Sequence, residues 1–184
     1  MNRILLTMAV AIGLVGCRDT TKSELTGSKV ELSAADESAV RAIVSEFAET
    51  WNRHDMKAMH ELNTANVEWI NVTGNHWRGN ATVFKGHDTI HRTVFAKTDM
   101  NFDEILVRAA APNVAIAVAT MKFGPVVIPT GEVLSELRTR GSFTIVKDDG
   151  RWKIAHFQNT SIDEAAEKND PITWDATGFL PGGK

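Results

Sequence analysis

The sequence predicts one α+β domain, with its helices in the first half of the chain and most of its strands in the second. Apolar residues recur at helical spacing over residues 34–53, which indicates an amphipathic helix. Two long alternating runs meet at Asp148-Asp149-Gly150, and Asp-Gly between such runs is typical of a β-hairpin. The expected order is helix, helix, strand, helix and four strands, which favours helices covering one face of a sheet.

The start of the first helix is marked by Ser33. An acid follows at Asp36 or Glu37, so the segment resembles a capping box. The helix is expected to end before His54-Asp55, and the Asp55 carboxylate can cap a short second helix over residues 56–62.

A strand is predicted over residues 67–72, followed by a turn at Gly74-Asn75. Residues 76–79 then lead into a third helix over residues 81–97. Gly86 lies in the middle of that helix, where glycine is about 1 kcal/mol less favourable than alanine. It marks either a kink or a close approach by another segment.

The second half of the chain reads as strands over residues 102–110 and 114–123, then a loop over residues 124–131 that contains two prolines. Residues 132–147 and 151–161 form the hairpin. Strict alternation along its second strand places Trp152, Ile154, His156 and Gln158 on one face and Lys153, Ala155, Phe157 and Asn159 on the other.

The first residues have the pattern of a targeting signal. Arg3 precedes an apolar run over residues 4–16, and Leu14-Val15-Gly16-Cys17 resembles a bacterial lipobox. Cys17 is then the lipid attachment site, and Arg18 resembles a sorting signal for the outer membrane. An ordinary secretory signal with a chance cysteine is the alternative. We therefore expect a lipid-anchored protein of the bacterial cell envelope that faces the periplasm.

These patterns divide the chain into a signal peptide over residues 1–16, a tether over 17–32, a domain over 33–162 and a tail over 163–184. The apolar tail residues Trp174, Phe179 and Leu180 suggest that the tail docks on the domain, where it could cover a pocket. Cys17 is the sole cysteine, so no internal disulfide is expected. A net charge of −3 without a basic stripe argues against nucleic acid as a partner.

Four segments together resemble one family: Trp51 to Asp55, Trp69 to Gly74, Trp77 to Gly79 and Phe157 to Thr160. They are similar to the SnoaL-like branch of the nuclear-transport-factor-2-like superfamily, in particular its SgcJ/EcaC group, over about residues 36–162. The resemblance implies a cone-shaped curved sheet covered by three N-terminal helices, one deep pocket and a homodimer. Members of the family include isomerases, cyclases, hydrolases and non-catalytic binding proteins.

Polar residues near the expected pocket are candidates for ligand binding: Asn71, Trp77, His91, His156 and Gln158. Asn71 either points into the pocket or caps the Gly74 turn, and Trp77 is either a lid or a core residue. His156 and His91 are the candidate acid–base groups, because imidazole exchanges protons near neutral pH.

A metal site is a weaker hypothesis, with His87, His91 and His156 as its ligands. His87 and His91 share a helix face at i, i+4 but lack the glutamate of a zincin motif. The alternative has His87 exposed and His91 packed beside Phe95. We expect no cofactor.

Two functions remain open from the sequence. The first is binding of a small, largely apolar molecule, and the second is cofactor-independent isomerisation or hydrolysis by a pocket histidine. The chain contains no tyrosine, so it cannot supply the tyrosine oxyanion donor of ketosteroid-isomerase-like relatives.

Overall fold

The computed structural model describes residues 30–128 and 130–173 of the chain. The predicted signal peptide, Cys17 and the apolar tail residues Trp174, Phe179 and Leu180 lie outside these ranges. The helices are α1 (Ala34–Asn52), α2 (Met56–Glu61), α3 (Asn80–His91), α4 (Glu164–Lys168) and a 3₁₀ turn at Pro171–Thr173. The strands are β1 (Asn63–Ile70), β2 (His76–Arg78), β3 (Asp99–Ala111), β4 (Val114–Gly124), β5 (Val126–Val127), β6 (Val133–Leu134), β7 (Leu137–Asp148) and β8 (Arg151–Ser161).

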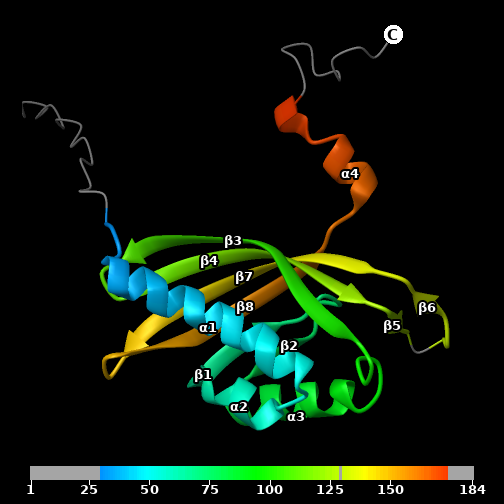
Figure 1. Ribbon diagram of the computed structural model, residues 1–184, viewed down its shortest axis with the longest axis horizontal. Helices are drawn as coiled ribbons and strands as arrows, with labels where there is room; N and C mark the ends of the chain where they lie inside the picture. Colours follow the sequence, from blue (N-terminus) through cyan, green and yellow to red (C-terminus); the bar gives the residue numbers. More distant parts are fainter. Residues whose placement is uncertain (1–29, 129, 174–184) are drawn as a thin grey trace, which may run out of the picture.

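Six strands form one mixed sheet in the order β2-β1-β8-β7-β4-β3. The β1–β8 pair is parallel and the other pairs are antiparallel. The sheet is curved, with α1 lying across it and α2 and α3 at one end (Figure 1). The short β5–β6 hairpin extends from the opposite side of the sheet to the start of α1. The predicted α+β fold, with a curved sheet and N-terminal helices, is confirmed.

The start of α1 follows the capping prediction. The Ser33 hydroxyl accepts a hydrogen bond from the Asp36 backbone N–H, as the N-cap of a capping box does. The Asp36 carboxylate also accepts hydrogen bonds from Lys147 Nζ at 2.7 Å and from the Trp152 indole N–H at 2.8 Å. Asp36 therefore joins the first turn of α1 to both strands of the β7–β8 hairpin.

The hydrophobic core lies between α1 and the concave face of the sheet. Phe47 of α1 packs on Phe143 of β7, with ring centroids 5.6 Å apart, and Trp69 of β1 stacks on Phe157 of β8 at 4.2 Å. All four side chains are buried. Aromatic pairs at these separations add to the stability that burial of their area supplies.

Three local predictions in the first half of the chain are wrong. Residues 76–78 form β2, because they pair with β1 opposite Glu68 to Ile70. β1 begins at Asn63, where it already pairs with Ile154 of β8. α3 ends at His91, after which residues 92–97 form turns, such as the bond from the Phe95 N–H to the Ile90 carbonyl. The early start of β1 reflects long-range pairing with β8, whereas β2 forms by a hairpin with β1, and α3 ends where local turn bonds replace the helical ones.

An irregularity in β8 changes which side chains face the core. Thr144 pairs with His156, but Ile145 pairs with Ile154, so Ala155 is an extra residue opposite β7. Such a β-bulge shifts the alternation of faces by one residue. Ile154 is buried before the bulge and Phe157 is buried after it. Strict alternation along β8 was therefore a wrong prediction.

α4 extends away from the sheet (Figure 1), and none of its side chains is buried. An ion pair of 3.2 Å links Glu167 to Arg138 at the start of β7. Among the helices that the structure describes, none is long and apolar enough to cross a membrane.

The Asp36 junction yields a stability prediction. Asp36→Ala removes the shared acceptor of Lys147 and Trp152, so we expect a lower Tm at neutral pH. The pKa of the Asp36 carboxyl is lowered from 3.8 to about 2, mainly by the hydrogen bond from Lys147. Its contribution is therefore complete above pH 3.8 and disappears as the pH falls toward 2.

Thermal melts check this expectation. Glu37→Ala is the matched control, because it removes only an exposed ion pair with Arg41. Equal Tm values for Asp36→Ala and Glu37→Ala would contradict the structural role of Asp36.

Candidate functional site

A cavity of about 450 Å³ lies between α1, α3, the concave face of the sheet and the β5–β6 hairpin. Most of its wall is aromatic or aliphatic. These residues are Phe47, Trp51, Trp69, Val72, Trp77, Ile90, Val94, Phe95, Met121, Phe123, Val126, Ile128, Leu134, Leu137 and Phe157.

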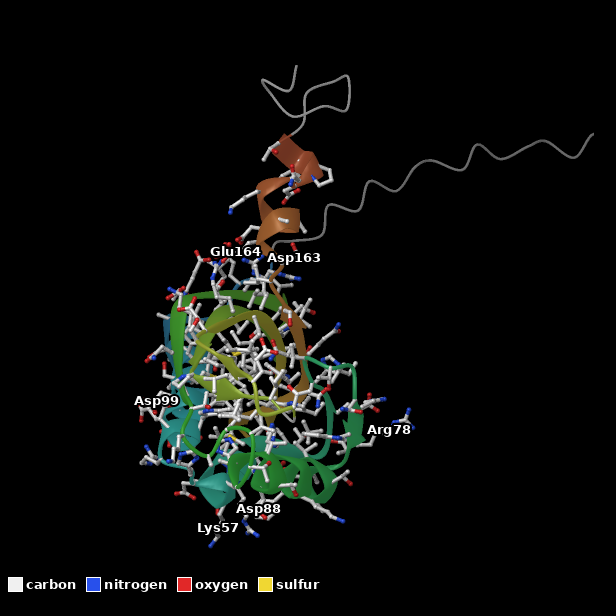
Figure 2. All side chains as sticks on the ribbon, turned by 90° about the vertical axis from the view of Figure 1, so that its right-hand side faces the viewer. Lys57, Arg78, Asp88, Asp99, Asp163 and Glu164 are labelled. Carbon is white, nitrogen blue, oxygen red and sulfur yellow. The ribbon has the colours of Figure 1, made fainter. Side chains whose placement is uncertain are left out.

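Charged groups are kept away from the cavity. No lysine, arginine, aspartate or glutamate of the described ranges lines its wall. From the side of β5 and β6, the sheet is seen to curl over the helices, and the labelled side chains of Lys57, Arg78, Asp88 and Asp99 lie at the outside of the domain (Figure 2). The cavity therefore suits a neutral guest, since burying an unpaired charge there would be costly.

His87 is the titratable residue of the cavity wall. It is 3% exposed, and the rings of Trp69 and Trp77 meet it nearly at right angles, with centroids 4.8 and 5.5 Å away. Its Nδ1 lies 3.1 Å from Nε2 of His60 on α2. Burial, followed by the proximity of His60 and His91, holds the pKa of His87 well below its usual range. His87 is therefore a neutral imidazole at neutral pH.

A second histidine pair lies one helical turn away. His91 Nδ1 is 2.8 Å from Nδ1 of His54, which sits in a left-handed conformation (φ 52°) just after α1. The His91 ring packs edge-on against Trp51 at 4.2 Å, and its Nε2 is buried without a hydrogen-bond partner. Burial, and then the neighbouring His54, lowers the pKa of His91 from 6.5 to about 4.

Trp77 lies against α3 at Gly86. A Cβ atom on Gly86 would be 2.6 Å from the Trp77 ring, so only glycine allows the indole to lie so close to the helix. The sequence left two explanations for Gly86, a kink in the helix or a close approach by another segment. The structure shows the second, because the Trp77 ring lies against the helix at Gly86. Trp77 is half-buried and forms part of the cavity wall.

Polar groups line two other parts of the wall. Asn71 lies at the cavity and also caps the Gly74 turn, because its Oδ1 accepts from the backbone N–H groups of Thr73 and Asn75. Asn159 and Ser161 line the wall from β8, and Asn159 Oδ1 is buried without a partner. The Asn71 oxygen is thus committed to the fold, whereas the Asn159 oxygen is not.

The sequence of this domain matches a known family. Residues 40–162 match the SnoaL-like domain. The chain belongs to the SnoaL-like domain family. No curated protein sequence matches it.

Solved structures share the SnoaL-like fold of this chain. An uncharacterized protein with a cystatin-like fold from Caulobacter vibrioides is 28% identical, with a TM-score of 0.71 over 74% of this chain and 96% of that one. A nuclear transport factor 2-like protein from Salmonella enterica serovar Typhimurium is 17% identical, with a TM-score of 0.63 over 72% and 94%. A ketosteroid isomerase-like protein from Erwinia carotovora atroseptica is 16% identical, with a TM-score of 0.61 over 71% and 99%.

His156 and Gln158 do not lie in the wall of the SnoaL-like cavity. His156 is half-buried beside Glu68 and Thr144, and Gln158 is exposed beside Ser142. The expectation that both side chains face the pocket was wrong, because the bulge at Ala155 turns them to the outer face.

The three candidate metal ligands also do not converge. His156 is on the outer face of the sheet, and His87 and His91 each pair with another histidine. Within residues 30–128 and 130–173, no group of three or more His, Cys, Asp or Glu side chains is arranged to hold a metal ion. The alternative to a metal site holds in part: His91 lies beside Phe95, with ring centroids 6.5 Å apart, but His87 is buried rather than exposed.

Sequence reasoning missed His60, His54 and Asn159. A signal existed for His60, because it follows Met56 at i, i+4 and so shares the buried face of α2. Asn159 could have been found from Phe157, a large apolar residue expected in the core. Residues two apart in a strand share a face, so Asn159 faces the same side as Phe157. Nothing in the local sequence predicts that His54, in the turn after α1, contacts His91 on α3.

Because Gly86 contacts Trp77, we expect Gly86→Ala to destabilise the protein, although alanine usually stabilises a helix. Gly86→Ala should stabilise a helix by about 1 kcal/mol from propensity alone. Here the clash with Trp77 should instead destabilise the protein by about 1–3 kcal/mol, as overpacking does. Urea unfolding measures the change, with the exposed Lys85→Ala as the control. The double variant Gly86→Ala/Trp77→Ala should lose the clash penalty; a stabilising Gly86→Ala alone would contradict the contact.

The buried imidazole of His91 predicts a loss of stability in acid. The unfolded chain takes up a proton on this residue as the pH falls through 6.5, whereas folded His91 does so only near 4. Between pH 6.5 and about 4, the unfolded state therefore binds more protons at His91 than the folded state does. As the pH falls through this range, the contribution of His91 lowers the free energy of unfolding by about 3 kcal/mol.

Urea unfolding at several pH values tests the contribution of His91. His91→Gln should make the loss shallower by up to about 1.4 kcal/mol per pH unit, while Lys85→Ala keeps the wild-type slope. Unchanged pH dependence in His91→Gln would show that the imidazole is not held neutral by the fold.

Proposed function

We propose that this protein binds a small, neutral, largely apolar molecule in the SnoaL-like cavity. The observation that carries the proposal is the wall itself: aromatic and aliphatic side chains dominate it, and the described chain contributes no charged side chain, since His87 is neutral. A volume of about 450 Å³ is within the range of small-molecule pockets. Contact with several tryptophan and phenylalanine rings favours a guest with rings of its own.

Cofactor-independent proton transfer is the second candidate, and the position of His87 favours it. His87 lines the cavity, and His60 fixes its ring orientation from behind, as a general base requires. This assignment replaces His156 and His91, which do not line the cavity. The low pKa of His87 weakens it as a base, so binding remains our first proposal.

We propose further that Cys17 carries a lipid that anchors the domain to the outer membrane, facing the periplasm. The lipobox-like Leu14-Val15-Gly16-Cys17 and the following Arg18 support this location. We assign the protein to the SgcJ/EcaC group and propose a homodimer, on the resemblance of the segments from Trp51 to Thr160. Half-buried apolar residues on the outer face of β4, such as Ile116 and Val118, would suit such an interface.

Filling the cavity tests the binding proposal. Leu134 lines the cavity, whereas its neighbour Val133 is 58% exposed. We expect Leu134→Trp to weaken binding of the neutral fluorescent dye Prodan by about tenfold or more, because the indole occupies the guest's space. Val133→Trp is the matched control and should keep wild-type affinity. Fluorescence titration measures both; dye binding that neither variant changes would contradict a ligand site in this cavity.

A further inference from the structure

The hydrogen-bond chain behind His87 fixes the position of its proton. His60 Nδ1 lies 2.6 Å from the backbone carbonyl of Met56, and a carbonyl only accepts, so this nitrogen carries the hydrogen. Burial lowers the pKa of His60 more than the carbonyls of Met56 and Val83 raise it, so the ring is neutral at neutral pH. Its Nε2 is therefore an acceptor.

The tautomer of His87 follows from that of His60. His87 Nδ1 faces the accepting Nε2 of His60 at 3.1 Å, so His87 Nδ1 must donate. Because a neutral imidazole has one N–H, the remaining nitrogen of His87, Nε2, has a free lone pair. Residue His87 lines the cavity, and Nε2 is the ring nitrogen that His60 leaves uncommitted.

The groups around Nε2 of His87 determine which guest molecules can bind to its lone pair. The rings of Trp51, Trp69 and Trp77 lie close to His87 and roughly perpendicular to its ring. The indole N–H of Trp51 is already committed to the Thr98 carbonyl at 3.2 Å. A guest oxygen without a hydrogen, placed at Nε2, would bring one lone pair against another. A guest O–H or N–H would satisfy Nε2.

We propose that the cavity selects ring-containing molecules that are neutral and carry an O–H or N–H donor, such as phenols or alcohols, with that donor bonded to Nε2 of His87. This inference rests on the proposed binding function. Carboxylates are excluded, since the described wall has no cation to pair with them. Ethers and ketones of the same shape bind more weakly, because they leave Nε2 unpaired. His60 acts as the positioning residue, since it determines which His87 nitrogen faces the guest.

Matched biphenyls test the proposal on the purified protein, by displacement of Prodan. We expect 4-hydroxybiphenyl to bind about tenfold more tightly than 4-methoxybiphenyl, as one net hydrogen bond allows. Biphenyl-4-carboxylate should bind most weakly. Equal affinities of the hydroxy and methoxy compounds would overturn the proposal while leaving the binding function intact. Failure of Prodan and of every biphenyl to bind would count against the binding function itself.

Variants separate the roles of the histidines. His87→Phe should remove the preference for the hydroxy compound but retain binding of 4-methoxybiphenyl. His60→Phe frees His87 to carry its hydrogen on Nε2, so the methoxy compound should gain affinity relative to the hydroxy one. A loss of affinity that is equal for both compounds would assign His60 a merely structural role. His91→Phe, which alters the neighbouring pair, is the control and should keep the wild-type preference.

A spectroscopic readout tests the tautomer without any ligand. In ¹⁵N NMR spectra of histidine-labelled protein at neutral pH, His87 should show a protonated Nδ1 and an unprotonated Nε2, with His60→Phe reversing the two. A wild-type His87 with its hydrogen on Nε2 would overturn the inference.

Discussion

The extra residue at Ala155 controls the chemistry of the cavity wall. Without this bulge, β8 would direct His156 and Gln158 inward and Phe157 outward. With it, Phe157 stacks on Trp69, and Asn159 follows it into the wall. Because of this one extra residue, the cavity wall contains the Phe157 ring and the Asn159 amide in place of the His156 imidazole and the Gln158 amide. The apolar character of the site depends on it.

Burial keeps both histidines of α3 neutral, although only His87 lines the cavity. His87 and His91 are removed from water and lie close to other imidazoles, and both effects oppose a positive charge. Hydrogen bonds to His60 and His54 replace the solvation that burial removes. The helical region at the base of the cavity therefore holds polar groups without holding charge, which is a combination that favours uncharged guests.

Elements that are determined by neighbouring residues in the chain could mostly be predicted from the sequence, and elements that depend on other segments could not. Ser33, Asp55 and Gly150 act through neighbours in the chain, so the starts of α1 and α2 and the hairpin turn could be predicted. The bulge at Ala155 lies where β8 pairs both with β7 and with β1 from the other end of the domain. The end of α3 and the strand β2 involve near neighbours, but the apolar pattern does not reveal their turns and pairing. The same distinction holds at the site. Asn71 and Trp77 were accessible to sequence reasoning through turn and aromatic patterns, whereas the His54–His91 contact requires the folded arrangement.

The parallel pairing of β1 with β8 has a consequence for folding. These strands come from the two ends of the domain, yet they lie side by side and contribute Trp69 and Phe157 to the same wall. Closing such a long loop is slow, because its entropy is lost before its contacts form. A chain emerging from synthesis, amino end first, therefore cannot complete the cavity until β8 arrives. Occupancy of the cavity would report that the whole domain has folded.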